Sequence, residues 1–551
     1  MERLENQMKN QMKHSNTVPY PDFDRMWSSI QQGELRTAAG GELAAPRSRS
    51  RKRTAIAVSL SVALMATPVY AAVTYDWSNL LSFRAGIETA LEQGLGQTIE
   101  QSVTRDGITL TLHTAFTDEN RTFLLYSLDP GASGKGKTVS FGNIGLKDAD
   151  GKLIKGNNTR QWNEELQVFQ GYFETDWVLK DRMADVEFVV ENVSFIEDAS
   201  QTIAFRPDHP ETQTFEIQKD GIGTVTLQSF DQPGDKVLLN SAITFTDPAV
   251  QSNSWVRIEA TDKEGARIQE VETPISGTPG TSGEYSNQQV FSAASLRAEG
   301  TTFQLKYDRT LGTADGTWSL RTALSKKQLE DSSFKERLNI PFTEVPGGTK
   351  IAEMIVTPTQ VRLVLTREEK FTGAHYMNYK LDVGGKLLNG SVWLVPNQSN
   401  KTELRFEMAG LTPESLAQQP LTLIANHRVD EHKGDDNPAV RLTGISTERQ
   451  TISSSVGEYP VTWTYYMKDG NLYVESSSTD SAFGGVNQTY YLDGKDREYG
   501  RPAILGVFGD GNNQHMDVYE NYNGTEQELY IYNYTTNHPD DELRVPINQG
   551  K

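Results

Sequence analysis

Through most of the chain beyond its first hundred residues, apolar side chains alternate with polar ones. Because successive side chains of a β-strand point to opposite faces, this alternation predicts half-buried strands. The runs are short and are separated by Gly, Asp, Asn and Pro, which are turn residues. The sequence therefore predicts a mainly β protein built from antiparallel β-sandwiches. The clearest runs are Ile108/Leu110/Leu112, Val361/Leu363/Leu365 and Val461/Trp463/Tyr465.

A loose repeat divides this β-rich region into tandem units. Similar stretches, each with two alternating runs joined by a polar turn, begin at Thr104, Gln218, Gly347 and Gly457. Their spacing is that of whole domains rather than of a solenoid. We expect four β domains, which cover residues 74–212, 213–345, 346–450 and 451–551.

Before the first strands, the residues from Asp76 to Gly96 follow a helical period. Leu80, Phe83, Ile87 and Leu91 lie on one face, which predicts an amphipathic helix. Ser78 is placed to cap its start, and Gly94 and Gly96 are placed to end it.

An uncharged apolar run extends from Thr54 to Val73. At about 1.5 Å per residue it is long enough to cross a bilayer core as a helix. Five basic residues lie between Arg47 and Arg53, and the next base after the run is Arg84. This asymmetry predicts a single-pass membrane protein with residues 1–53 in the cytoplasm and the rest outside. A cleaved signal peptide and a buried core helix are the alternatives.

The predicted cytoplasmic segment, residues 1–53, carries one apolar helical stripe. Phe23, Met26, Trp27 and Ile30 are spaced so that they share one face of a short helix. Such a stripe either packs locally or on the membrane surface, or it docks a cytoplasmic partner. These four residues are the candidate partner-binding site, and the residues that follow read as a flexible tether.

Charge and composition exclude several classes of function. Residues 1–53 carry ten Lys and Arg against six Asp and Glu, while the whole chain has a formal net charge of −20. The acidic outer part repels nucleic acid, so we expect no nucleic-acid partner. The chain has no cysteine, which excludes disulfides, thiolate zinc sites and a cysteine nucleophile.

The stretch from Gly131 to Thr138, GASGKGKT, matches the phosphate-binding loop pattern of nucleotide hydrolases. A working loop of this kind opens a helix whose N-terminal amides hold the phosphates. Here Val139 to Gly142 reads as a strand instead. We therefore interpret the stretch as a hairpin loop and not as an ATPase motif.

Other candidate sites are weaker. His427 and His432 form the closest histidine pair, residues 148–152 and 509–517 carry oxygen ligands without a calcium-loop pattern, and Ser332 with Lys335 lacks companion motifs. We expect no catalytic residues, no metal and no cofactor. Twelve of the 21 tyrosines lie beyond residue 450, where they either pair across strands or form a binding face.

The stretch GLGQTIEQSVTRDGITLTLHTAFTDENR resembles the domain-of-unknown-function 4179 family of Gram-positive, single-pass membrane proteins. The matching positions are Gly96, Ile99, Ser102 to Thr104, Asp106 to Thr111, Asp118, Asn120 and Arg121. Residues 213–340 resemble the immunoglobulin-like domain that often follows in such proteins. The resemblance implies association with an extracytoplasmic-function sigma factor and brings no catalytic residues.

Together these features predict a membrane regulator rather than an enzyme. It would sense an unknown extracellular ligand and restrain a cytoplasmic sigma factor through residues 1–53. Because this segment is short and lacks a His/Cys zinc motif, a surface-anchored binding module without a cytoplasmic partner is the alternative.

Overall fold

The computed structural model of the chain describes residues 75–551 with short gaps. The gaps are residues 135–136, 210, 233, 254, 273, 280–283, 343–347, 369–374, 396–397, 436, 505–508, 510 and 550–551. The described chain is mainly β and its strands pair antiparallel, as the sequence predicts. Four hydrophobic cores define four layered units, which we call the first to fourth sandwiches.

The first sandwich encloses a core that includes Leu110, Tyr126, Phe188 and Trp318. One sheet has the order β1-β2-β3-β7-β6, and β4 and β5 lie in the facing sheet with parts of β8 and β15. These strands are β1 (Gln97–Arg105), β2 (Ile108–Thr117), β3 (Thr122–Asp129), β4 (Thr138–Lys147), β5 (Leu153–Ile154), β6 (Asn157–Asn163), β7 (Val168–Thr175), β8 (Met183–Ile203) and β15 (Thr302–Ser325).

The second sandwich is inserted between β8 and β15. Its five-stranded sheet has the order β13-β14-β11-β10-β9, and it faces β12 and the remaining parts of β8 and β15. These strands are β9 (Gln213–Lys219), β10 (Ile222–Gln232), β11 (Lys236–Phe245), β12 (Val256–Thr261), β13 (Ile275–Pro279) and β14 (Tyr285–Ser292). The short helices α6 (Pro248–Asn253) and α7 (Ala293–Leu296) lie in its connections.

The third sandwich is one sheet bent over its own core. The start of β20 pairs with β19, and from Gly390 onward β20 pairs with β21 instead. A Cβ at Gly390 would lie 2.5 Å from the ring of Phe406, its partner on the paired strand β21, so this ring occupies the space that a side chain would take. The strands are β16 (Phe334–Pro341), β17 (Lys350–Val356), β18 (Gln360–Thr366), β19 (Tyr376–Val383), β20 (Lys386–Leu394), β21 (Lys401–Glu407), β22 (Pro420–Lys433) and β31 (Glu526–Gln549).

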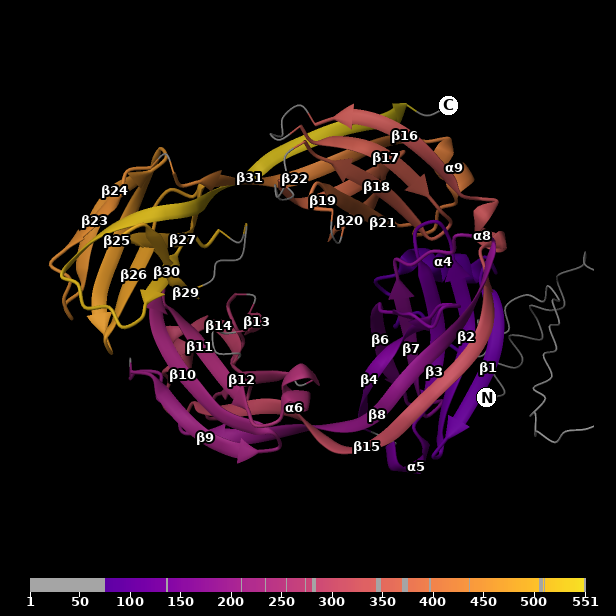
Figure 1. Ribbon diagram of the computed structural model, residues 1–551, viewed down its shortest axis with the longest axis horizontal. Coiled ribbons are helices and arrows are strands. Elements are labelled where there is room, and N and C mark those ends of the chain that lie inside the picture. Colours follow the sequence, from indigo (N-terminus) through magenta and orange to yellow (C-terminus); the bar gives the residue numbers. More distant parts are fainter. Residues whose placement is uncertain are drawn as a thin grey trace, which may run out of the picture. The chain divides into compact units, whose positions relative to one another are not determined.

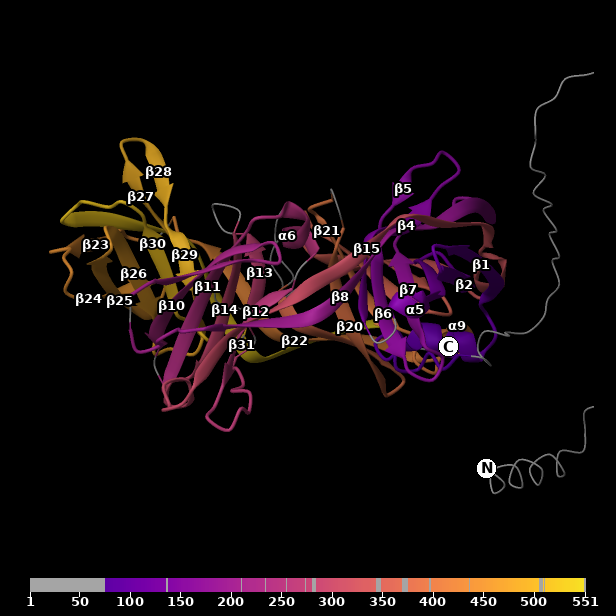
Figure 2. The ribbon, with the colours of Figure 1, turned by 90° about the horizontal axis from the view of Figure 1, so that it is seen from below.

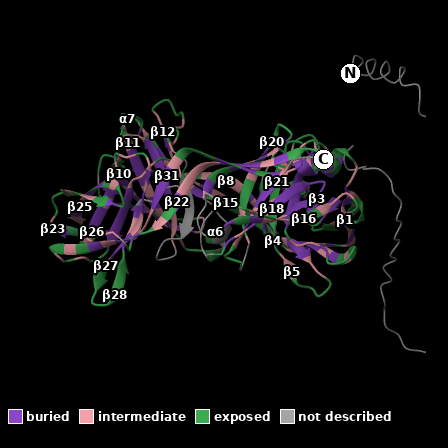
Figure 3. Cartoon of the chain, turned by 90° about the horizontal axis from the view of Figure 1, so that it is seen from above, coloured by how far each residue is buried: buried purple, intermediate pink, exposed green. Residues whose placement is uncertain are grey.

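The fourth sandwich is inserted between β22 and β31 in the same manner. A sheet of order β24-β25-β26-β30-β29 faces β23, β27, β28 and the inner ends of β22 and β31. The β27–β28 hairpin ends in an exposed tip, visible in Figure 3. The strands are β23 (Val440–Thr443), β24 (Gln450–Val456), β25 (Tyr459–Lys468), β26 (Asn471–Ser477), β27 (Phe483–Asp493), β28 (Asp496–Tyr499), β29 (Arg501–Ile504) and β30 (His515–Tyr519).

Two pairs of long strands therefore connect the sandwiches. β8 and β15 pair from Met183 with Ser325 to Ile203 with Phe303, and they run side by side in Figures 1 and 2. β22 and β31 do the same for the third and fourth sandwiches. The end of β15, including the buried Trp318, belongs to the first core although it lies within the expected unit 213–345. The expected domain boundaries remain predictions.

The predicted helix between Asp76 and Gly96 is shorter than expected. Only α4 (Ala85–Glu92) is α-helical, and residues 78–83 form turns. Ile87 and Leu91 are buried as predicted, but Phe83 is 85% exposed because it belongs to the turns. Ser78 does not cap α4; its hydroxyl bonds to Asp76. Gly94, with φ +71°, ends the helix as predicted, by a Schellman arrangement of backbone bonds.

Three short helices lie in the remaining connections of the described chain. Helix α5 (Gly131–Gly134) lies before β4, α8 (Lys327–Glu330) follows β15, and α9 (Pro413–Ala417) precedes β22. The Trp318 indole N–H donates to the carbonyl of Ile108 at 3.0 Å, which satisfies the polar atom of this buried side chain.

Candidate functional site

The candidate partner-binding residues Phe23, Met26, Trp27 and Ile30 lie outside the described residues, as does the apolar run 54–73. Within the described part of the chain, no helix is long and apolar enough to cross a membrane. The stripe and the membrane span therefore remain predictions.

The phosphate-loop pattern forms a connection between two sheets. The four-residue helix α5 is followed by β4, which begins at Thr138, so a strand follows the pattern as predicted. The prediction of a hairpin loop is wrong, because β3 and β4 belong to opposite sheets of the first sandwich. Gly131 has φ +67°, and a Cβ there would lie 2.5 Å from the carbonyl oxygen of Gly107. The glycine thus serves close backbone packing.

Residues of the other sequence patterns make local structural contacts. Asp148 accepts the amides of Asp150 and Lys152, as a turn residue does. Lys335 pairs with Glu353 at 2.7 Å. His427 contacts Asn537 and His432 contacts Thr536, so each ring has its own partner on β31. Among the described residues, no group of three or more His, Cys, Asp or Glu is arranged to hold a metal ion.

The most organised polar cluster begins at the turn between β2 and β3. Asp118 accepts the backbone amides of Asn120 and Arg121 at 2.8 and 3.0 Å, which shapes the turn. All three side chains are buried, and Arg121 is only 1% exposed. A fully buried arginine needs charged partners, since an unpaired buried charge is costly.

Arg121 finds these partners on two different sandwiches. Its guanidinium donates to Glu174 of the first sandwich at 2.8 Å. It also donates to both carboxylate oxygens of Glu407, at the end of β21 in the third sandwich, at 2.7 and 2.8 Å. The two parallel bonds form the bidentate arrangement that is strong and geometrically specific. Arg121 is therefore the centre of a contact between the first and third sandwiches, which we call the ionic joint.

The turn between β17 and β18 supplies the other side of the ionic joint. The Thr359 hydroxyl donates to Asp118 at 2.6 Å, and the backbone carbonyl of Thr359 accepts from Arg121 at 3.1 Å. The Asn120 amide donates to the carbonyl of Gln360 at 3.0 Å. Arg362 donates to the carbonyl of Asn120. The turn thus fits between the side chains of the 118–121 turn.

Helix α4 also takes part in the ionic joint. The Gly86 amide donates to Glu407 at 3.1 Å, and the Gly410 amide donates to the Thr89 hydroxyl at 2.9 Å. Arg84, just before the helix, pairs with Glu174 at 2.7 Å. The helix that follows the predicted membrane span therefore contacts both the first and the third sandwich.

A second row of ion pairs extends the ionic joint toward solvent. Arg405 of the third sandwich donates to both oxygens of Asp176 of the first, at 2.7 and 2.9 Å. Glu403 contacts both Arg405 and Arg362. The Trp393 ring lies against the Arg405 guanidinium at 4.3 Å. This row orients Arg405 from three sides.

The electrostatics keep the central groups charged. Burial alone raises the pKa of Glu174, but Arg121 and Arg84 outweigh it, so this pKa lies below its usual value. Burial lowers the pKa of Arg121, and the carboxylates of Glu407 and Glu174 more than reverse that effect. Glu174 and Arg121 are thus both charged at neutral pH.

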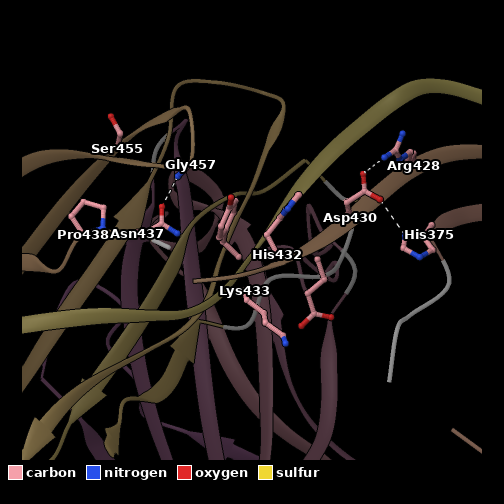
Figure 4. A pocket seen from close by; sticks show the side chains of 11 residues that line it. His375, Arg428, Asp430, His432, Lys433, Asn437, Pro438, Ser455 and Gly457 are labelled. Atoms are coloured by element: carbon pink, nitrogen blue, oxygen red, sulfur yellow. Dashed lines mark hydrogen bonds and ion pairs between the residues drawn. The ribbon is translucent and has the colours of Figure 1, made fainter. Parts of the chain in front are cut away.

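A polar groove lies where the third and fourth sandwiches meet, with a volume of about 790 Å³. Figure 4 shows Asp430 between His375, at 3.1 Å, and Arg428, at 2.8 Å. Burial raises the pKa of Asp430, but the two partners lower it to about 2. The groove offers both positively and negatively charged hydrogen-bonding groups. Its lining residues are His375, Arg428, Asp430, Glu431, His432, Lys433, Asn437, Pro438, Ser455, Gly457 and Tyr534.

Many tyrosines of the fourth sandwich pair with aromatic neighbours. Tyr466 stacks on Tyr473 at 5.3 Å, and Tyr490 stacks on Tyr530 at 5.4 Å. Tyr534 stacks on His432 at 4.9 Å. These contacts favour the interpretation in which the tyrosines stabilise the sheets.

Comparison with known proteins finds a family match in the first quarter of the chain. Residues 46–129 match the family model of the domain of unknown function DUF4179, which confirms the resemblance in the sequence. The matched segment ends with β3 and includes the 118–121 turn of the ionic joint.

Two further comparisons add little. No curated protein matches. A similar solved structure is "the conserved domain protein from Bacillus anthracis", with 12% identity over 57% of this chain and 89% of that chain. Its TM-score of 0.17 supports no structural argument.

The sequence resemblance named Asp118, Asn120 and Arg121 but not their partners. Glu174, Thr359 and Glu407 carry no local signal, since surface acids and threonines are common in β-rich chains. Only the fold brings them to Arg121.

Proposed function

We propose that the chain is a single-pass membrane regulator of the DUF4179 type. Its outer part, a helix followed by immunoglobulin-like sandwiches, receives an extracytoplasmic signal. Residues 1–53 pass this signal to a cytoplasmic partner, for which a sigma factor is the candidate. The protein acts by binding, not by catalysis.

The observation that carries the proposal is the position of α4. In the sequence the helix follows shortly after the apolar run 54–73. Its Gly86 and Thr89 bond to the third sandwich, and the adjacent Arg84 bonds to Glu174. A rearrangement of the outer sandwiches would therefore move the segment that leads to the membrane. An inert tether needs no such contacts.

The test uses the predicted cytoplasmic stripe. Trp27→Ala removes the large aromatic anchor, and truncating such an anchor commonly costs about 2 kcal/mol or more, or over tenfold in affinity. Transcription from the cognate promoter should rise while the amount of membrane protein stays constant. Ser28→Ala is the matched control, since Ser28 lies off the stripe, and it should leave transcription unaltered. A flat response to both Trp27→Ala and deletion of residues 1–46 would contradict the proposal.

The alternative is a surface-anchored binding module, and the polar groove of Figure 4 favours it. In that case outer ligand binding would persist in the Trp27→Ala variant, and no promoter would respond. Protease added to intact protoplasts tests the topology that both candidates share. Only residues 1–53 should be protected, whereas a soluble mature form beginning near Ala72 would argue against a membrane anchor in either case.

A further inference from the structure

Within the described part of the chain, two contacts between sandwiches that are distant in the sequence differ in chemistry. The second and fourth sandwiches meet through a hydrophobic cluster, which we call the apolar joint. Gln288 also donates a hydrogen bond to the carbonyl of Ala503 across it. Its members are Phe230, Leu238, Val290, Tyr466, Tyr473, Ala503, Met516 and Val518. Among the described residues, no hydrophobic cluster joins the first and third sandwiches at the ionic joint.

This difference decides which contact opens first. Separating the apolar joint exposes apolar side chains to water, at a cost proportional to their area. Separating the ionic joint returns charged groups to water, and their hydration offsets most of the lost attraction. Polar interfaces between domains are also the ones that commonly move.

When the ionic joint separates, no buried arginine is left without a carboxylate partner. On the first sandwich, Arg121 keeps Glu174, and Glu174 keeps Arg84. On the third sandwich, Arg405 and Arg362 keep Glu403. The buried arginines of each half therefore keep a carboxylate partner, while Glu407 and Asp176, whose side chains are 22% and 49% exposed, exchange theirs for water.

The long strands carry irregularities where they cross between sandwiches. The register of β15 against β8 shifts between Thr310 and Gly312, which leaves Leu311 unpaired. The register of β22 against β31 shifts between Asn426 and Arg428, and His427 there has φ +63°. Bulges bend a strand and weaken its ladder locally. Both connections thus have a point at which they can flex.

We infer that the ionic joint is a latch, which opens while the apolar joint stays closed. In the closed state, α4 is bonded to the third sandwich through Gly86 and Thr89. In the open state it contacts the first sandwich alone. The inference deepens the proposed function. Only the effect of the latch on the cytoplasmic partner rests on that proposal. The latch itself is a property of the outer sandwiches.

Spin-label distances test the latch in the full-length protein in lipid nanodiscs. The chain has no cysteine, so introduced cysteines are the only labelling sites. Ser102→Cys and Asn389→Cys, both at exposed positions, report on the ionic joint. Thr214→Cys and Ser453→Cys report on the apolar joint in the same way. Pulsed dipolar spectroscopy gives a distance distribution for each pair.

The opening variant is Glu407→Lys, which places a positive charge against Arg121. The distribution for the Ser102 and Asn389 pair should shift to longer distances and broaden, while the Thr214 and Ser453 pair stays unchanged. Glu259→Lys is the matched control, because it makes the same charge change at the ion pairs of the second sandwich. It should leave the first pair unaltered.

Two outcomes would overturn the latch. One is a narrow, unshifted distribution across the ionic joint in Glu407→Lys, and the other is equal broadening across both joints. If Glu407→Lys does not accumulate, Glu407→Gln supports the same comparison with the same two outcomes.

The reporter assay separates this inference from the proposed function. Selective opening in Glu407→Lys with no change in transcription would leave the latch standing and defeat the sigma-factor proposal. A transcriptional response with no opening would do the reverse.

Discussion

Gly86→Ala distinguishes a latch from a rigid interface by the sign of its effect on stability. A Cβ at Gly86 would lie 1.8 Å from the carbonyl oxygen of Thr359 and 2.8 Å from Glu407. Real Cβ atoms do not approach closer than about 3.0 Å, so the third sandwich must retreat by roughly 1.2 Å. The Arg121 bonds to Glu407, at 2.7 and 2.8 Å, would then exceed hydrogen-bonding length.

If the interface is rigid, this clash has to be absorbed in place. Overpacking of a close-packed contact costs about 1–3 kcal/mol. That loss corresponds to a fall in Tm of about 2–4 °C per kcal/mol for a unit of 150–250 residues. If the ionic joint opens instead, the clash disappears and α4 keeps the helix propensity of alanine over glycine, about 1 kcal/mol. Tm then stays constant or rises slightly.

The assay combines differential scanning calorimetry with the spin-label pair at Ser102 and Asn389. The latch requires a longer, broader distance distribution together with an unchanged or raised Tm. Glu92→Ala is the control, because it changes an exposed residue of the same helix and adds no atom at the ionic joint. A Tm lowered by several degrees with an unshifted distribution would refute the reasoning.

Three further predictions test the charges and the glycine-rich segment. Arg121→Ala leaves Glu174 with Arg84 as its one remaining ion-pair partner among the described residues, so the first sandwich should lose about 1–3 kcal/mol in urea unfolding, and an unchanged stability would contradict the pairing. The pKa of Glu174 is lowered on folding, so its contribution to the free energy of unfolding is complete above the unfolded pKa of about 4.3 and is lost as pH falls through the folded pKa. Glu174→Gln should therefore make the free energy of unfolding depend less on pH in the acid range. An identical pH dependence in both proteins would count against this assignment. Lys137→Ala should leave stability unaltered, with no ATP binding by calorimetry in either protein, and ATP binding that this change abolishes would reverse our interpretation of the glycine-rich segment.

Local patterns in the sequence identified much of the β-structure. Leu110, Leu363 and Trp463 are buried in three different cores, as the alternation predicts. Asp106 and Gly107 both have positive φ and join β1 to β2, as an Asp-Gly hairpin turn does. Such features depend on neighbours within a few residues, so composition and spacing are enough to find them.

The arrangement of the sandwiches depends on contacts that leave no local pattern. Glu407 lies 286 residues from Arg121, and nothing in its surroundings in the sequence marks it as a partner. Phe83 was expected on a buried helical face because the helical period extends through it, but the helix begins only at Ala85. The return of β15 to the first core depends on pairing with β8, more than a hundred residues earlier.

A charged joint suits a contact that must open and re-form, and this accounts for the placement of the family motif. An apolar face that is exposed at each opening invites association with other apolar surfaces. The faces around Arg121 and Arg405 remain polar and internally paired when separated. Re-closing is specific, because the bidentate bonds to Glu407 and Asp176 require matched planes. The apolar joint between the second and fourth sandwiches has no such provision, so it is the fixed contact about which the ionic joint opens.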